Sequence, residues 1–134
     1  MMKVFLGGTC NESTWRDELI NLLEIDYYNP VVPNWTEECM KKEREQRETC
    51  DYCLYTITPL MTGVYSIAEA VEDSIKRPHK TIFCLYDSIK DKKRFTASEL
   101  KSLNQVGKMI ERNGGKYFAN LLDVALYLNK KGEQ

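Results

Sequence analysis

Glu69 is the residue of this sequence best placed to do chemistry. It lies in the stretch 60–72, which follows an apolar segment and is typical of a loop leading into the first turn of a helix. In parallel sheets, ligands bind where strands end and the following helices begin. The positive end of a helix dipole also favours a charged carboxylate, which a nucleophile requires. We therefore expect Glu69 to face a ligand as an ionised group, although a solvated surface glutamate would also fit this position.

Other routes to catalysis find little support in the residues. The chain has 1 histidine, His79, which follows a proline in a turn, so a histidine-based triad is not expected. Cys50 and Cys53 have the spacing of half a zinc site, but a second pair of ligands is missing. They enter an expected strand, where residues three apart point to opposite faces. We interpret the cysteines as free thiols and predict no metal site.

Three loops should meet at the carboxyl edge of the sheet and contact the ligand. The first is rich in glycine, which lets backbone N–H groups approach a ligand closely. The second ends a short strand with an asparagine that can bond a sugar or a base, and the third supplies an aromatic ring and a hydroxyl beside Glu69. The candidate substrate-binding residues of these loops are Gly7, Gly8, Thr9, Asn29, Pro30, Gly63, Tyr65 and Ser66.

A very polar helix is expected over residues 36–48, with Asn34 and Glu37 as its capping box. Glu43 and Arg47 lie four residues apart on one face of it. They form a surface ion pair in one interpretation, and Arg47 contacts a substrate phosphate in another. Asp51 precedes the next strand and is more typical of a turn than of a catalyst.

Short apolar runs alternate with amphipathic stretches along the whole chain. Strands are expected over residues 3–6, 26–29, 52–58, 81–86 and 116–118, and helices follow each of them. The third helix should span residues 65–76 and bury Ile67, Val71 and Ile75. Thr96 and Glu99 form a capping box for the fourth helix, whereas Asn11, Ser13 and Thr14 are all plausible caps for the first.

This alternation predicts an α/β protein. We expect one domain, residues 1–134, with a doubly wound, flavodoxin-like, five-stranded parallel sheet and helices on both faces. The 19 Lys and Arg against 20 Asp and Glu give a net charge of −1, which argues against nucleic acid as a partner. The apolar runs are too short to span a membrane. The 5 cysteines, in a chain that needs no disulfides, favour a cytoplasmic protein.

Four stretches of the sequence resemble the nucleoside 2-deoxyribosyltransferase-like family. They are residues 3–8, 28–30, 50–52 and 57–69, in order and at suitable spacing. The segment Ser66-Ile67-Ala68-Glu69-Ala70 is similar to the helix start that carries the nucleophile of that family, which makes Glu69 the matching residue. The sequence departs from the family at Phe5, where studied members have a tyrosine, and at Gly63, where they have an aspartate.

The resemblance implies a flavodoxin-like, usually oligomeric enzyme that cleaves the N-glycosidic bond of deoxynucleosides. Glu69 would attack C1′ in a retaining mechanism, and the sugar would pass to another base or to water. Glu43, or less readily Asp51, would protonate the leaving base. No cofactor is expected, because the glycosidic carbon is already electrophilic. The expected partners are a nucleoside or nucleotide and further copies of the chain.

Three alternatives stay open at this point. The first is a hydrolase of nucleotides, with Gly7, Gly8, Thr9 and Arg47 around the phosphate. The second is a sensor that binds nucleosides or nucleotides without turnover, as the missing tyrosine and aspartate would allow. The third is an interaction module whose contact surface is the polar helix.

Overall fold

Five parallel strands form one sheet in the order β2-β1-β3-β4-β5 in the computed structural model, which describes residues 1–10 and 12–133. The predicted flavodoxin-like α/β fold is confirmed. Asn11, one of the candidate helix caps, lies outside the described residues. The strands are β1 (Lys3–Gly8), β2 (Asp26–Tyr28), β3 (Tyr52–Ile57), β4 (Thr81–Leu85) and β5 (Lys116–Phe118).

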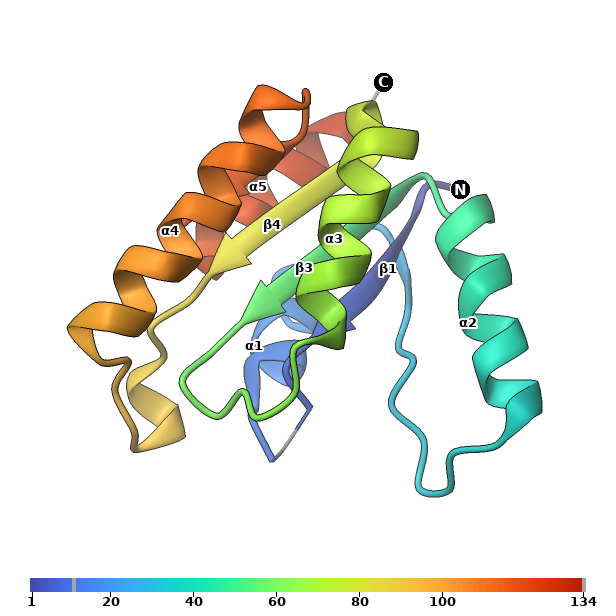
Figure 1. Cartoon of the computed structure of the whole chain (residues 1–134). Helices are drawn as coiled ribbons and strands as arrows, with labels where there is room; N and C mark the ends of the chain where they lie inside the picture. The colour runs from blue at the N-terminus through green and yellow to red at the C-terminus, as the bar shows by residue number, and fades with distance from the viewer. Residues whose placement is uncertain (11, 134) are drawn as a thin grey trace.

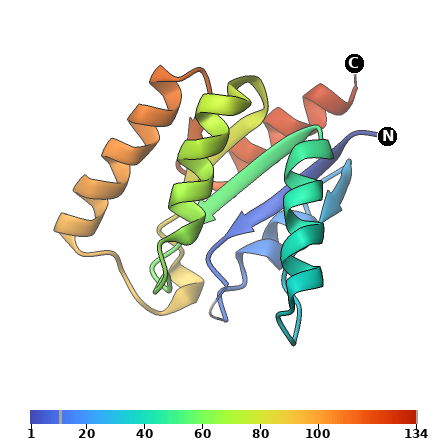
Figure 2. The same ribbon diagram turned by 45° about the vertical axis from the view of Figure 1, so that its right-hand side comes forward.

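Helices cover both faces of the sheet (Figure 1). On one face lie α1 (Trp15–Ile20) and α5 (Leu121–Gly132), and on the other lie α2 (Glu37–Thr49), α3 (Tyr65–Lys76) and α4 (Ala97–Arg112). Two short 3-10 turns, η1 (Pro78–Lys80) and η2 (Ile89–Asp91), flank β4. Figure 2 shows the same division after a turn of 45°. Because both faces are covered, the central strands are buried on both sides and read as continuous apolar runs.

The face under α1 and α5 is packed by apolar side chains. Alternate residues of the strands point to it, and the two helices close it. Its buried members include Val4, Leu6, Trp15, Leu19, Leu54, Ile82, Val124 and Leu128. The opposite face has its own apolar core around Phe5, Tyr55, Ile57, Ala70, Phe83 and Ile110. Polar groups lie among these residues, and α3 supplies most of them.

The bounds of α3 are as predicted, and Ile67 packs partly buried against the core, but the expected stripe is wrong at Ile75. Ile75 is 68% exposed, and the buried residues of the helix are Glu69, Ala70, Asp73 and Ser74. Hydrophobic periodicity identifies the face that would be buried against an apolar partner. Here the partner is the side chain of Arg47, which forms ion pairs with Glu69 and Asp73. The acidic face of α3 is therefore the one that is buried.

The N-terminal caps predicted from the sequence agree with the structure at one helix and differ at others. The capping box of Thr96 and Glu99 is present as predicted. The box predicted at Asn34 is wrong, because Thr36 caps α2 and its hydroxyl accepts from the Cys39 N–H at 3.2 Å. Thr14 precedes α1 without a side-chain cap.

The described residues contain no helix with both the length and the apolar character needed to cross a bilayer. Within the same residues, no three side chains of His, Cys, Asp or Glu gather as a metal site would require. Cys50 and Cys53 are buried free thiols, and burial raises the pKa of Cys53 to about 12. Such thiols pack as small apolar groups.

Candidate active site

A cavity of about 180 Å³ opens at the carboxyl edge of the sheet. The end of β1, the segment between β2 and α2, the middle of α2 and the first turns of α3 enclose it. Parallel α/β sheets bind their ligands at this edge. The lining residues are Gly7, Gly8, Cys10, Arg16, Pro30, Trp35, Glu43, Tyr65, Ser66 and Glu69.

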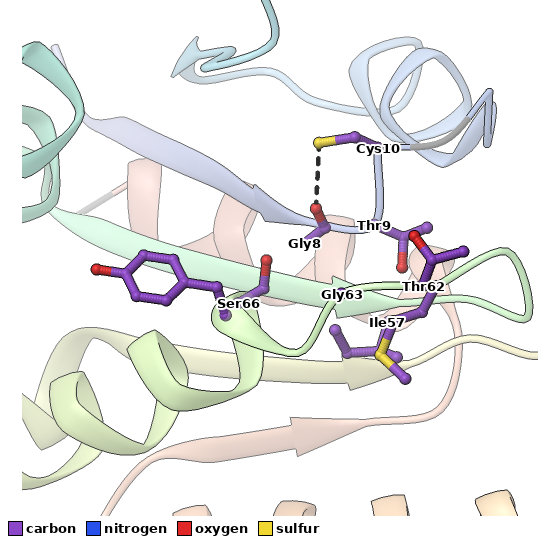
Figure 3. Close-up of a pocket in the computed structure, with 9 residues that line it drawn as sticks. Gly8, Thr9, Cys10, Ile57, Thr62, Gly63 and Ser66 are labelled. Carbon is purple, nitrogen blue, oxygen red and sulfur yellow. Dashed lines mark hydrogen bonds between the residues drawn. The ribbon is translucent and has the colours of Figure 1, made fainter. Parts of the chain in front are cut away.

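A second cavity of about 260 Å³ adjoins the first and shares four of its lining residues (Figure 3). Its walls carry hydroxyl groups, backbone and apolar side chains, and no carboxylate lines it among the described residues. The Sγ of Cys10 donates to the Gly8 carbonyl at the junction of the two. The lining residues are Gly8, Thr9, Cys10, Ile57, Met61, Thr62, Gly63, Tyr65 and Ser66.

The glycines at the end of β1 serve the sheet as well as the cavity. The strand continues through Gly8, two residues beyond its predicted end. Gly8 has a φ of +122°, and a Cβ there would lie 2.0 Å from the carbonyl oxygen of Thr56 on β3. A side chain at Gly8 would therefore push β1 and β3 apart, so this position requires glycine for the sheet as well as for the cavity.

Glu69 is 8% exposed and lies in the second turn of α3, not in the first as expected. Arg47 contacts it, with 3.2 Å between Nη1 and Oε2. Burial and then the neighbouring Glu43, through its charge and a hydrogen bond, raise the pKa of Glu69 to about 8 against the opposing effect of Arg47. Burial and a second carboxylate therefore oppose the ionised form that the helix dipole is expected to favour.

Glu43 and Glu69 both line the first cavity. Glu43 is half-buried on α2, and its charge and hydrogen bonding contribute to the raised pKa of Glu69. Two carboxylates at such close range titrate as a pair, with one proton retained to higher pH. The pair can therefore offer one acid and one base in the same site.

Arg47 is neither a surface ion-pair partner of Glu43 nor free to contact a phosphate. It is 6% exposed, and its guanidinium is occupied by the carboxylates of α3. Nη2 lies 2.9 Å from Asp73 and 3.0 Å from Glu72, besides the contact of Nη1 with Glu69. Burial disfavours the charge on Arg47, but hydrogen bonding to Asp73 and the surrounding anions raise its pKa above the ordinary value.

Asp73 lies at the centre of this buried network and has no exposed surface. The Tyr55 hydroxyl and Arg77 also donate to its carboxylate. Burial opposes the charge, but hydrogen bonds from Arg47, Tyr55 and Arg77 lower the pKa of Asp73. Asp73 was not predicted as a site residue, although it stands four residues after Glu69 and so shares its helix face.

The structure leaves two candidates away from the cavity. Asp51 precedes β3 at the opposite, amino edge of the sheet, where its carboxylate accepts from the Lys3 N–H at 2.9 Å. Asn29 is exposed, and its side chain accepts from the Val31 N–H at 3.1 Å, which makes a local turn. Pro30 does line the cavity. Asp51 and Asn29 are therefore left out of the site.

Arg16 is a second buried cation that the sequence analysis did not single out. Its guanidinium donates to the carbonyls of Leu6, Gly8 and Thr9, and it borders the cavity near Glu43. These bonds fix the turn after β1. No local signal distinguishes Arg16 from the exposed arginines of other helices, because its acceptors come from the fold.

The fold and the paired carboxylates define a flavodoxin-like α/β protein with a candidate acid–base site at its carboxyl edge. A family model described as nucleoside 2-deoxyribosyltransferase like matches residues 1–89, and the chain belongs to this family. The matched segment contains β1 to β4 and both glutamates. No curated protein and no solved structure matches the chain.

Proposed function

We propose that this protein cleaves the N-glycosidic bond of deoxynucleosides or their nucleotides and passes the sugar to another base or to water. The observation that carries the proposal is the Glu43–Glu69 pair in the cavity at the carboxyl edge of the sheet. The family assignment supports glycosyl transfer on nucleosides as the reaction class.

In the first step, a carboxylate oxygen of Glu69 attacks C1′ while the bond from C1′ to the base nitrogen breaks. The electrons of that bond go to the base, which takes the proton of Glu43. An ester between Glu69 and the sugar results. In the second step, an incoming base or water attacks C1′ and gives its proton to Glu43, and the ester bond returns its electrons to Glu69.

The two cavities differ in charge, which supports separate subsites for the reacting bond and for the rest of the substrate. The first cavity, with Glu43 and Glu69, would surround C1′ and the reacting bond. The second would take the rest of the substrate through Thr9, Gly63 and Ser66. Tyr65 borders both cavities and can stack on a base.

Self-association is part of the same proposal. Large apolar side chains stand exposed at or beside the mouth of the first cavity, which supports a contact with another copy. Sedimentation at several concentrations measures this directly, and a monomer at all of them would remove it. The exposed side chains are Val31, Val32, Trp35, Val64 and Tyr65.

The decisive experiment combines a mechanism-based inhibitor with product analysis. Intact-mass measurement after exposure to a 2-fluoro-2-deoxy nucleoside should show one sugar adduct, located on Glu69 by peptide mapping. The Glu69→Gln variant should show none, whereas Glu45→Gln, at an exposed glutamate of α2, should react normally.

Parallel incubations with deoxynucleosides or their 5′-monophosphates, each with a second free base, separate transfer from hydrolysis and the two substrate classes. Saturable binding without any product across these substrates would overturn the enzymatic proposal and favour a nucleoside or nucleotide sensor. Absence of both binding and product would favour an interaction module.

A further inference from the structure

Arg47 is the basic group that directly contacts the carboxylate pair among the described residues. Its Nη1 meets Oε2 of Glu69 at 3.2 Å, and the contact is shielded from water on both sides. Opposite charge at this distance stabilises the ionised form of a carboxyl group. The contact therefore favours the ionised form of Glu69 and opposes the effects of burial and of the neighbouring Glu43.

The guanidinium cannot turn away from Glu69, because its other nitrogens are held. Nε donates to the Tyr55 hydroxyl at 3.0 Å and to Asp73 at 3.3 Å, and Nη2 donates to Asp73 at 2.9 Å. A planar guanidinium fixed at two edges presents its third nitrogen in one direction. Asp73 and Tyr55 thus fix the direction from which Glu69 is contacted.

The remaining charged groups around the pair act less directly. Asp73 disfavours a charge on Glu69 from the same helix, but its own charge is matched by Arg47 and Arg77. Arg16, from α1, interacts electrostatically with Glu43 and donates to the backbone carbonyls of β1 and the turn after it. Cys10 also borders the cavity. The ion pair with Arg47 is therefore the direct contact that stabilises a charge on Glu69.

We propose that Arg47, anchored by Asp73 and Tyr55, is a positioning residue that fixes one carboxyl oxygen of Glu69 and stabilises the ionised form of Glu69 for attack. The inference rests on the proposed function for its purpose, since the ionised form is the one that can attack C1′. In this arrangement Oε2 of Glu69 stays with Arg47, and the other oxygen is the one that attacks.

The test is a carboxyl titration that needs no turnover. Glutamate labelled with ¹³C at the side-chain carboxyl is incorporated, and the signals of the pair are identified with Glu69→Gln and Glu43→Gln. In Arg47→Met, the midpoint of Glu69 should rise by about one pH unit or more, because an adjacent cation is lost. Arg44→Met, at an exposed arginine of the same helix, should leave it unchanged.

Arg47→Lys keeps the charge without the rigid fork and guards against misfolding of the methionine variant. It should raise the midpoint less than Arg47→Met does, and Tyr55→Phe should raise it least. Thermal unfolding of each variant shows that the measurements come from folded protein. An unchanged Glu69 midpoint in folded Arg47→Met, or in folded Arg47→Lys if Arg47→Met does not fold, would overturn the inference.

Kinetics separates this inference from the proposed function. The acidic limb of the pH–rate profile, which reports ionisation of the nucleophile, should move to higher pH in Arg47→Met and Arg47→Lys but not in Arg44→Met. A lower rate with an unmoved limb would indicate a purely structural arginine and overturn the inference. A shifted NMR midpoint in a protein without turnover would preserve the effect of Arg47 on Glu69 and overturn the proposed function instead.

Discussion

Both faces of the sheet have an apolar core, but the helices add different groups to the two cores. Under α1 and α5, the same strands that carry the site bury apolar side chains such as Val4, Leu6 and Leu54. Under α2 and α3, they meet a guanidinium and the carboxylates Glu69 and Asp73. Burying a leucine stabilises a fold by roughly 1.5–3 kcal/mol, whereas a buried ion pair contributes little net stability after desolvation.

The difference teaches that one face depends on apolar packing, whereas the other combines its apolar core with the buried charges of the candidate site. Among the residues of α2, all of which the structure describes, Arg47 is the fully buried one. The helix is thus attached mainly through the residue that also contacts Glu69. Buried charges with shifted pKa values cluster at functional sites, which is consistent with this division. The following predictions test it, from the largest expected effect to the smallest.

Glu69→Gln should reduce turnover by about 10⁴-fold, because the nucleophile of the proposed reaction is lost. The temperature of unfolding should stay the same or rise, since a buried carboxyl group is replaced by a neutral side chain. Product formation and thermal unfolding are measured on the same samples. Leu54→Ala, on the apolar face, should show the reverse pattern, with lost stability and retained turnover per folded molecule. Equal losses of stability in Glu69→Gln and Leu54→Ala would contradict the proposed difference between the two faces of the sheet.

Asp73→Asn should destabilise the fold by about 3–5 kcal/mol, because it leaves Arg47 buried without its main partner. The double change Arg47→Met with Asp73→Leu should recover most of that loss, since apolar side chains can replace a buried ion pair. Turnover should remain low in the double variant. Denaturant unfolding measures both variants, and a double variant less stable than Asp73→Asn would show that the ions themselves stabilise this face.

Raising the pH from 5 to 9 should lower the free energy of unfolding by on the order of 2 kcal/mol through Glu69. The pKa of this group is raised from 4.5 to about 8 in the fold, so the folded state binds its proton more tightly and loses that advantage as the pH passes 8. Asp73, whose pKa is lowered, titrates below this range. The Glu69→Gln variant should show a flatter curve, and Glu45→Gln should follow the unmodified protein. A Glu69→Gln curve as steep as that of the unmodified protein would assign the slope to other groups.

Thr36→Ala should destabilise the start of α2 by about 1 kcal/mol, because the hydroxyl that accepts from Cys39 is lost. Hydrogen exchange should accelerate in the first turn of α2 and leave α1 and α5 unchanged. Thr96→Ala provides the matched cap on α4, where exchange should change over that helix only. Faster exchange throughout the sheet in Thr36→Ala would mean that α2 is more firmly integrated than its single buried residue indicates.

Local patterns were sufficient for the framework of the fold. The alternation of apolar runs and amphipathic stretches predicted the sheet, and the bounds of α3 and the capping box at Thr96 were confirmed. These features depend on residues close together in the sequence, where propensity and capping act directly. The position of Glu69 near the start of α3 was predicted for the same reason, since the start of the helix can be read from the sequence.

The details of the site depend on partners that are remote in the sequence. Arg47 and Asp73 stand 26 residues apart, and their contact at 2.9 Å decides which face of α3 is buried. The shift in the pKa of Glu69 likewise needs Glu43 from another helix. A hydropathy pattern cannot contain this information, because it describes one element at a time. The charge state of the site was therefore beyond prediction from the residues alone.

The exposed thiol of Cys10, where the two cavities join, offers a practical way to watch the site. Three of the other cysteines in the described residues are buried, so replacing Cys39 by serine would leave one readily accessible attachment point for a fluorophore. A small environment-sensitive dye there would change its emission as ligands enter or leave. Ligand screening could then proceed before any natural substrate is identified.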